Sequence, residues 1–305
     1  MSAVPNADTV KKANTEESVN AASLNGDLYA YPMTADNGYF LYYDKRYLSE
    51  EDVKTLDGIL AVAEATGKQF SMEFNSGWYL YSFFGNTGLQ FGLNEDGVTN
   101  YCNWNTTEGT VTGMHVGEAL VKLASSPAFL PQGNGDFVTA ATAEDTTIIA
   151  GISGVWHAVA LQEAWGENCG AVKLPTYTCN GQQVQMASFT GYKMVGVNSY
   201  SENVEWAHKF ADWITNEENQ KIRFEERSQG PSNIKAAASD EVMKVPAIAA
   251  VIDQSQYGVL QRVGNNFWTP CTEFANALVE KKPTGAELQE LLDILVQGIT
   301  ASTAG

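Results

Sequence analysis

The feature that most constrains the fold is an alternation between short apolar runs with strand character and longer stretches with helical periodicity. Helical spacing of apolar residues is weak over residues 8–23 and clear over residues 49–66, 116–124, 202–216 and 286–299. Runs typical of strands are residues 28–31, 39–43, 147–152, 170–175 and 184–197. Such alternation predicts an α/β architecture. No repeat of about 20–50 residues is visible, so we do not expect a solenoid.

Two of the predicted helices carry a well-defined apolar face. In residues 286–299 the leucines, one valine and one isoleucine recur at helical spacing, so this helix should lie flat on a core. In residues 202–216 we expect a buried face formed by Ala207, Phe210, Ala211 and Ile214.

The composition excludes several classes of partner. The chain has 305 residues, is 44% hydrophobic and carries a formal net charge of −18, so it can bury a core but repels phosphate backbones and anionic membranes. We therefore expect no nucleic acid or membrane partner. No apolar run approaches the roughly 20 residues of a membrane span, and the start of the chain has no basic and apolar pattern of a signal peptide.

The four cysteines and the other polar motifs do not predict a metal site, a cofactor or a disulfide. The cysteines form no CxxC pair, and their pairing stays open. Residues 94–97 have a fragment of calcium-loop character but read better as a β-turn. There is no phosphate-binding glycine motif and no GxSxG nucleophile motif.

Aromatic residues at turn-like positions are the strongest functional signal. They occur in Gly77-Trp78-Tyr79, Gly154-Val155-Trp156 and Asn266-Phe267-Trp268. Trp and Tyr rings present an apolar face with a polar edge, which suits the faces and hydroxyl rims of sugar rings. Core packing is the alternative for any one of these rings. Together the three segments predict an aromatic-lined sugar site.

Catalysis is the competing interpretation of the same aromatics. Asp36, Glu73, Glu163 and Glu167 are candidates for the paired carboxylates of a glycoside hydrolase, but sequence spacing does not show two of them flanking one bond. No nucleophile has a visible base partner. We therefore expect a binding protein with no catalytic residues, and a glycoside hydrolase or other carbohydrate-active enzyme stays open as an alternative.

A two-part crossover segment and five further motifs, all in the same order, resemble the maltose-binding branch of the bacterial extracellular solute-binding proteins. They are Leu28-Tyr29-Ala30-Tyr31-Pro32 followed by Leu41-Tyr42-Tyr43-Asp44-Lys45, then Ile152-Ser153-Gly154-Val155-Trp156, Val172-Lys173-Leu174-Pro175, Gly191-Tyr192-Lys193-Met194-Val195 and Trp213-Ile214-Thr215-Asn216, with Asn266-Phe267-Trp268 near the end. The resemblance implies a two-lobe periplasmic-binding-protein-like fold of type II. It places the N-lobe in residues 1–35 and 195–250, and the C-lobe in residues 40–190 and 255–305.

The same resemblance implies a function and a set of site residues. Trp78, Tyr79, Trp156 and Trp268 match ring-stacking positions, and Asp36 or Asn37 falls at an acidic hydrogen-bonding position near the hinge. The family captures sugars for an ABC importer, so a maltose or maltodextrin-type oligosaccharide and membrane permease subunits are the expected partners of a monomer. The expected location is extracellular or periplasmic, as a soluble or lipid-anchored protein.

The chain departs from the family pattern in two ways. Ser76-Gly77 replaces an acidic residue before the first stacking aromatic, and Thr272 replaces an arginine after the last one, so the identity of the sugar does not carry over. The family also has further N-lobe residues before these motifs, which implies an N-terminally truncated chain with an incomplete N-lobe. Uncovered apolar faces and aggregation would follow, and an inactive fragment is a third alternative.

Overall fold

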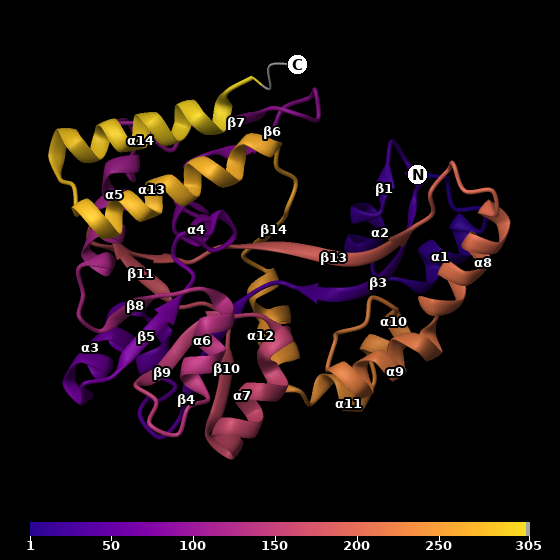
Figure 1. The fold of residues 1–305 in the computed structure, drawn as a ribbon, viewed down its shortest axis with the longest axis horizontal. Helices are drawn as coiled ribbons and strands as arrows, with labels where there is room; N and C mark the ends of the chain where they lie inside the picture. Colours follow the sequence, from indigo (N-terminus) through magenta and orange to yellow (C-terminus); the bar gives the residue numbers. More distant parts are fainter. Residues whose placement is uncertain (303–305) are drawn as a thin grey trace.

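The computed structural model of the protein describes residues 1–302, which form a larger and a smaller body (Figure 1). Two long strands, β3 (Ala30–Asn37) and β13 (Ser188–Gly196), run between the bodies. They pair antiparallel from Gly191 opposite Asn37 to Gly196 opposite Ala30, and their register is irregular around Lys193. The first of these strands continues through Asn37, so the chain crosses between the bodies in an extended conformation.

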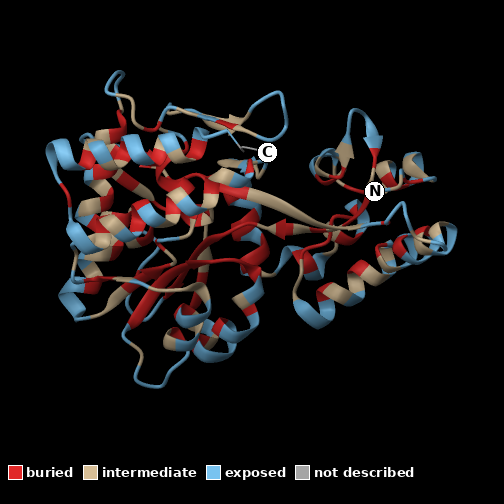
Figure 2. Ribbon diagram, turned by 45° about the horizontal axis from the view of Figure 1, so that its top comes forward, coloured by how far each residue is buried: buried red, intermediate tan, exposed pale blue. Residues whose placement is uncertain are grey.

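The larger body is built on a five-stranded mixed sheet. Its strand order is β10-β4-β9-β5-β8, with β5 parallel to β8 and β9, and β4 antiparallel to β9 and β10. The strands are β4 (Phe40–Asp44), β5 (Gln69–Met72), β8 (Phe129–Pro131), β9 (Ile148–Ser153) and β10 (Cys169–Val172). Buried residues are concentrated in this sheet and on the helix faces that meet it (Figure 2).

Both faces of the sheet are covered, which explains why its strands are apolar without a polar face. Along β4, Leu41 and Tyr43 enter one apolar cluster, while Phe40 and Tyr42 enter a second cluster on the other face. The first cluster contains α3 (Leu56–Thr66), α4 (Gly77–Phe84), α5 (Gly113–Ala124), α13 (Trp268–Lys281) and α14 (Gly285–Thr300). The second contains α6 (Asn134–Ala141), α7 (Ala158–Trp165) and α12 (Pro246–Ser255).

Short strands and 3-10 turns complete the larger body. Two hairpins pair β6 (Phe91–Leu93) with β7 (Asn100–Cys102) and β11 (Thr176–Cys179) with β12 (Gln182–Gln185). The strand β14 (Gly258–Leu260) runs parallel to the start of β13. The turns are η1 (Asp52–Lys54), η2 (Val155–His157), η3 (Gly166–Asn168) and η4 (Asn265–Phe267). Residues 94–97 form a turn in the first hairpin, as predicted, with φ +69° at Gly97.

The smaller body has a small apolar core. Eight buried residues form its cluster within the described chain, namely Val4, Val10, Ala22, Leu28, Ala30, Tyr31, Val197 and Ala211. Its elements are α1 (Ala7–Ala13), α2 (Glu16–Ala21), β1 (Ser23–Leu24), β2 (Asp27–Leu28), α8 (Val204–Ile214), α9 (Glu217–Arg227), α10 (Ile234–Ala237) and α11 (Asp240–Met243).

The predicted helices and strands are largely confirmed, with one informative error. The last helix is found as α14, with Leu288, Leu292, Leu295 and Ile299 buried. On α8, however, Phe210 is 60% exposed although we expected it on the buried face. The apolar cluster of the smaller body includes Ala211, with Val204 and Ala207 packed against it, and does not include Phe210.

The division into lobes stays a proposal, and α12 suggests a different position for one boundary. Ala247, Ile248 and Ala250 share an apolar cluster with Phe40 and Tyr42 of the larger body. Because α12 also packs against β10 and β4, we place this boundary before α12, rather than at the predicted residue 250.

Candidate functional site

Three tryptophans selected from the sequence begin helices on the larger body. Trp78 is the second residue of α4, Trp156 lies in η2, and Trp268 is the first residue of α13. Trp78 and Trp268 are half-buried, and Trp156 is 39% exposed.

Trp78 and Trp268 rest on one aromatic cluster. The ring of Trp78 stacks on Phe189 with centroids 5.7 Å apart and meets the edge of Tyr39 at 5.5 Å. Phe267 lies between Phe189 and Trp268, at 5.8 Å and 5.1 Å respectively. The two tryptophans are therefore supported from below by buried rings, which restrict their movement.

Trp156 is held by a hydrogen bond and by a glycine. Its indole Nε1 donates to Oδ1 of Asn134 at 2.8 Å. The ring packs directly over Gly154, where an added Cβ would lie 2.2 Å from a ring carbon and 2.6 Å from the carbonyl oxygen of Gly38. Only glycine leaves room for this approach.

A small polar cluster lies beside Trp156. Ser153 Oγ donates to Oδ1 of Asn134 at 3.0 Å and lies 2.9 Å from Nδ1 of His157. Partial burial lowers the pKa of His157, so its imidazole is more readily neutral than a free histidine. Asn134, Ser153 and His157 can exchange donor and acceptor roles with a hydroxyl-rich ligand, and the sequence did not single out Asn134 or Ser153.

Asp36 is buried in the strand that crosses between the bodies. Its Oδ2 accepts a 2.6 Å hydrogen bond from the Gly230 backbone N–H, while its Oδ1 is buried and has no partner among residues 1–302. Burial raises the pKa of Asp36, and the positive charge of Lys193 opposes that rise. An unpartnered buried carboxylate oxygen is costly, so a ligand hydroxyl donating to it would be favourable.

Asn37 is half-buried at the end of the same strand. Its Nδ2 would lie 2.6 Å from a Cβ added to Gly191, so the amide packs closely on the opposite strand. The next residue, Gly38, contributes the carbonyl oxygen beneath Trp156, and Tyr39 donates from its hydroxyl to the Trp78 carbonyl at 2.7 Å. Residues 36–39 therefore bring Asp36, Asn37, Trp78 and Trp156 into one neighbourhood.

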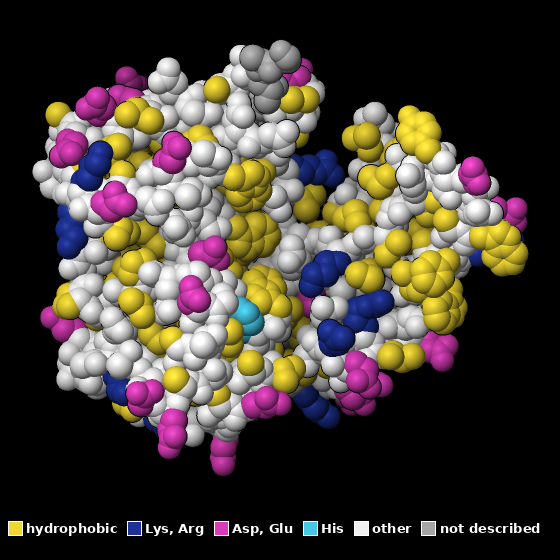
Figure 3. All heavy atoms as spheres, in the orientation of Figure 1, with side chains coloured by type: hydrophobic (Ala, Val, Ile, Leu, Met, Phe, Trp, Pro, Cys, Tyr) yellow, Lys and Arg dark blue, Asp and Glu magenta, His cyan; other side chains and the backbone are white. Residues whose placement is uncertain are grey.

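A hollow lies between the two bodies (Figure 3). Figure 3 shows the molecule hollowed there, with hydrophobic side chains gathered on the wall of the larger body and basic side chains on the smaller one. An apolar aromatic wall opposite polar groups is typical of sites that bind neutral polar ligands.

Tyr79 does not join this surface. It is 3% exposed, and its ring packs on Tyr39 with centroids 4.9 Å apart. Burial raises the pKa of its phenol. Because Tyr79 follows Trp78 in the helix, it points about 100° away from that ring and into the core. In this geometry it supports the site from behind and offers no ring face to a ligand.

The candidate carboxylates for hydrolysis are not arranged as a pair. Oε2 of Glu73 accepts a hydrogen bond from the Asn134 backbone N–H at 3.3 Å. Glu163 lines a different hollow of about 380 Å³, beside Tyr42 and Val245 on the other side of the sheet. The described part of the chain holds no cluster of metal-ligating side chains and no helix suited to crossing a membrane.

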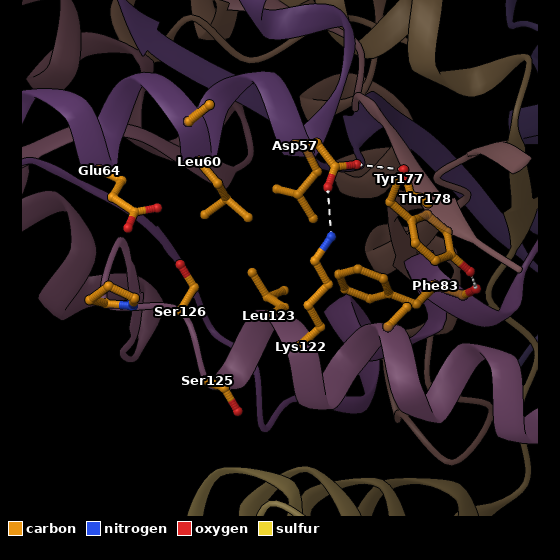
Figure 4. A pocket seen from close by; sticks show the side chains of 14 residues that line it. Asp57, Leu60, Glu64, Phe83, Lys122, Leu123, Ser125, Ser126, Tyr177 and Thr178 are labelled. Carbon is orange, nitrogen blue, oxygen red and sulfur yellow. Dashed lines mark hydrogen bonds and ion pairs between the residues drawn. The ribbon is translucent and has the colours of Figure 1, made fainter. Parts of the chain in front are cut away.

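A further groove on the larger body shares none of the predicted site residues. It lies between α3 and α5, has a volume of about 410 Å³, and has an apolar wall that includes Leu60 and Leu123 (Figure 4). Asp57 stands at one end, paired with Lys122 at 3.1 Å and accepting from the Thr178 hydroxyl at 2.6 Å. Asp57, Lys122 and Thr178 thus satisfy one another, while Glu64, Ser125 and Ser126 also line the groove (Figure 4).

Comparison with protein families decides the affiliation. The model of a family described as bacterial extracellular solute-binding protein matches residues 2–250. The chain belongs to this family. The match confirms the resemblance found in the motifs. The members of this family bind solutes and are not enzymes, which agrees with the expectation of a binding protein.

Two curated relatives are similar over most of the chain. The galactooligosaccharide-binding protein of Bacillus subtilis (strain 168) is 30% identical over 297 residues, which cover 93% of this chain and 68% of the relative. The maltooligosaccharide ABC transporter solute-binding lipoprotein of Streptococcus pneumoniae serotype 4 is 26% identical over 264 residues. That match covers 83% of this chain but only 60% of the relative, so the chain spans less than two thirds of its length.

Solved structures confirm the fold. One described as a complex with acarbose is 30% identical, with a TM-score of 0.83 over 96% of this chain and 76% of the other. The ligand-free maltodextrin-binding protein of L. casei BL23 is 24% identical, with a TM-score of 0.82 over 98% of this chain and 78% of the other. The protein therefore has the α/β periplasmic-binding-protein fold that the motifs implied.

Proposed function

We propose that the protein is the substrate-binding component of an ABC importer and captures a maltodextrin-type oligosaccharide between its two bodies. The observation that carries this proposal is the set of Trp78, Trp156 and Trp268, three partly accessible indoles at the starts of helical segments of the larger body. Rings held in this way suit the apolar faces of successive sugar units. Asp36, Asn37 and Asn134 would then bind hydroxyl groups.

The names of similar proteins support an oligosaccharide and differ on which one. One relative is named for galactooligosaccharides and another for maltooligosaccharides, and one similar structure contains acarbose. We favour the maltodextrin type because the stacking positions resemble those of the maltose-binding branch and one relative is named for maltooligosaccharides. A galactooligosaccharide is the direct competitor.

Closure of the bodies around the ligand would follow from the fold. The bodies are joined through β3 and β13, whose irregular register near Lys193 is a natural place for bending. The protein would act as a monomer outside the cell, held there freely or by a lipid anchor, and deliver its ligand to permease subunits.

Calorimetric titration of the protein tests the ligand. We expect heat of binding with maltotriose and less with galactotriose. Trp156→Ala or Trp268→Ala should lower the affinity about tenfold, since an aromatic stacking contact contributes about 0.5–1.5 kcal/mol beyond the apolar area that it buries. Trp206→Ala is the matched control, because Trp206 lies on α8 and is 69% exposed. Stronger binding of galactotriose would assign the other sugar class, and no heat with either sugar would overturn the proposal.

A further inference from the structure

The segment that carries Trp156 also carries a histidine whose hydrogen bonds can be assigned atom by atom. His157 is half-buried, and its ring meets that of Trp156 edge-on with centroids 6.3 Å apart. Its Nδ1 lies 2.9 Å from the hydroxyl oxygen of Ser153. Its Nε2 has no hydrogen-bond partner among residues 1–302 and stays accessible to water. The imidazole therefore has one nitrogen turned to the protein and one that is open.

The side chain of Asn134 has only one orientation that satisfies its neighbours. The indole Nε1 of Trp156 is always a donor, and it lies 2.8 Å from the amide oxygen of Asn134. The carbonyl oxygen of Ile152 is always an acceptor, and it lies 3.2 Å from the amide nitrogen. Turning the amide round would set a donor against a donor and an acceptor against an acceptor. Oδ1 of Asn134 is therefore fixed as an acceptor beside Trp156.

That orientation also fixes the proton of Ser153. Its Oγ lies 3.0 Å from Oδ1 of Asn134, so the hydroxyl donates there, since two oxygens at this distance with no proton between them would repel each other. A hydroxyl group has only one proton to donate. Ser153 must then accept from His157, and the donor is the Nδ1–H of the imidazole. Because Ser153 is buried, bulk water does not compete for these positions.

The neutral form of His157 has a lone pair on Nε2, because its proton is held on Nδ1. Burial lowers the pKa of His157 and is the one cause of that shift, which favours the neutral form. The segments around η2 carry ionisable groups at Tyr42, Glu73, Asp136, Glu163, Lys244 and Asp253. None of these groups contributes to the shift. The open nitrogen is therefore an acceptor near neutral pH.

We propose that His157 is a ligand-binding residue whose Nε2 accepts a hydrogen bond from a hydroxyl group of the sugar that covers Trp156. The contact rests on the proposed function, to which it adds a residue of defined polarity. The donors that run from His157 through Ser153 to Asn134 leave the imidazole no other neutral form. A sugar hydroxyl can donate to Nε2, whereas a ring or glycosidic oxygen cannot. The site would therefore select a free hydroxyl at this position of the ligand.

Protonation of His157 would change only the side of the ring that faces the ligand. Nδ1 already carries a proton, so acid adds the second proton at Nε2 and leaves the bonds to Ser153 and Asn134 as they are. The added proton removes the acceptor, and a bound sugar shields the new charge from water, which disfavours the charged form. Affinity should then be full where His157 is neutral and should fall as pH decreases through its pKa.

Nuclear magnetic resonance tests the assignment without a ligand. A long-range proton–nitrogen spectrum of the ¹⁵N-labelled protein identifies the protonated nitrogen of the His157 ring. We expect Nδ1 to carry the proton in the native protein at pH 7.5. Ser153→Ala should allow both neutral forms, because the acceptor of the Nδ1–H is then lost. A proton on Nε2 in the native protein would overturn the proposal.

Calorimetric titration with maltotriose between pH 8 and pH 5 tests the contact. We expect an affinity about three- to tenfold lower at pH 5, as the loss of one hydrogen bond predicts, and a pKa of His157 that falls on binding. His157→Gln should bind with an affinity that changes little over this range. His115→Gln is the matched control, because His115 caps α5 and glutamine can keep that bond. Its pH dependence should equal that of the native protein.

The outcomes separate this contact from the proposed function. Equal pH dependence of affinity in the native protein and in His157→Gln would overturn the contact and leave sugar binding in place. Absence of heat with maltotriose and with galactotriose at every pH would overturn the proposed function and the contact together. A pH dependence that His157→Gln removes and His115→Gln retains would support the contact.

Discussion

The indole N–H of Trp156 donates to the side-chain oxygen of Asn134 over 2.8 Å, and Asn134 is itself fixed to the sheet. Its Nδ2 donates to the carbonyl oxygen of Ile152 at 3.2 Å, and its Oδ1 also accepts from the Ser153 hydroxyl. The orientation of the most exposed tryptophan of the site is thereby tied to β9. A ring held before the ligand arrives loses less conformational entropy on binding.

Asn134→Ala should weaken sugar binding without removing a stacking ring. Trp156 would lose its acceptor, and we expect an affinity about five- to tenfold lower, which corresponds to about 1 kcal/mol. Calorimetry with maltotriose measures the change, and circular dichroism checks that the fold is intact. Unchanged affinity would show that Asn134 does not orient the ring.

Gly154→Ala should displace the same ring from the other side. The added methyl group would lie 2.2 Å from a ring carbon of Trp156 and 2.6 Å from the Gly38 carbonyl oxygen, so the indole has to move. We expect at least a tenfold loss of affinity with little change in secondary structure. Gly135→Ala is the matched control, because an added Cβ there meets nothing within 4 Å. Equal affinities of the two variants would contradict the proposed packing.

Asp36→Asn should separate stability from binding. Burial raises the pKa of Asp36, so the folded state holds its proton more tightly than the unfolded state does. The native protein therefore loses stability as pH rises above the ordinary pKa of an aspartate, 3.8, and through the raised folded value. The asparagine removes this dependence while still accepting from Gly230.

Urea unfolding at several pH values measures this effect. We expect Asp36→Asn to be more stable than the native protein at pH 7, by on the order of 1 kcal/mol, and the difference to vanish at low pH. Sugar affinity should fall, because the unpartnered oxygen becomes part of an amide. A variant that is less stable at pH 7 would show that the carboxylate is paired in solution.

Much of the fold could be predicted because local pattern and environment agree. The apolar run of residues 147–152 is buried on both sides as β9, and the repeated leucines of α14 all face one cluster. Phe210 was placed wrongly because helical periodicity shows that an apolar face exists but not whether anything covers it.

The site could be predicted only in part for a similar reason. Trp78, Trp156 and Trp268 carry a chemical signal of their own, whereas Asn134 carries none until the fold brings it to the indole N–H of Trp156. Tyr79 shares its segment with Trp78 but lies on the inner side of α4. The side of a short helix that meets the core depends on packing partners far away in the sequence.

Arg46→Ala should destabilise the larger body. Asp44 has a side chain that is 1% exposed, and Nε of Arg46 donates to both of its oxygens at 2.9 Å. Loss of the guanidinium leaves a buried carboxylate with fewer partners, which should lower the free energy of unfolding by about 1–3 kcal/mol. Because Arg46 is half-exposed and partly solvated, we expect a value at the lower end of this range. Urea unfolding measures the change.

Lys54→Ala is the matched comparison for that substitution. Lys54 pairs with Glu51, and both side chains are largely exposed, so no measurable change in the free energy of unfolding is expected. If both substitutions have the same effect, burial of Asp44 does not determine the strength of the first pair.

The four cysteines should be unreactive in the native protein. All four are free, and burial raises the pKa of Cys102 to about 12 and that of Cys169 to about 11. Burial also raises the pKa of Cys179 and Cys271. The thiolate is the reactive form of cysteine. At pH 8, about one molecule in a thousand or fewer carries a thiolate at Cys169 or Cys102.

Ellman's reagent at pH 8 should label four thiols after unfolding in guanidinium and almost none before. Tyr200→Cys supplies the comparison, since Tyr200 is 93% exposed and a thiol there should react within minutes. A native cysteine that reacts as fast as this added one would show that the larger body opens to solvent on that timescale.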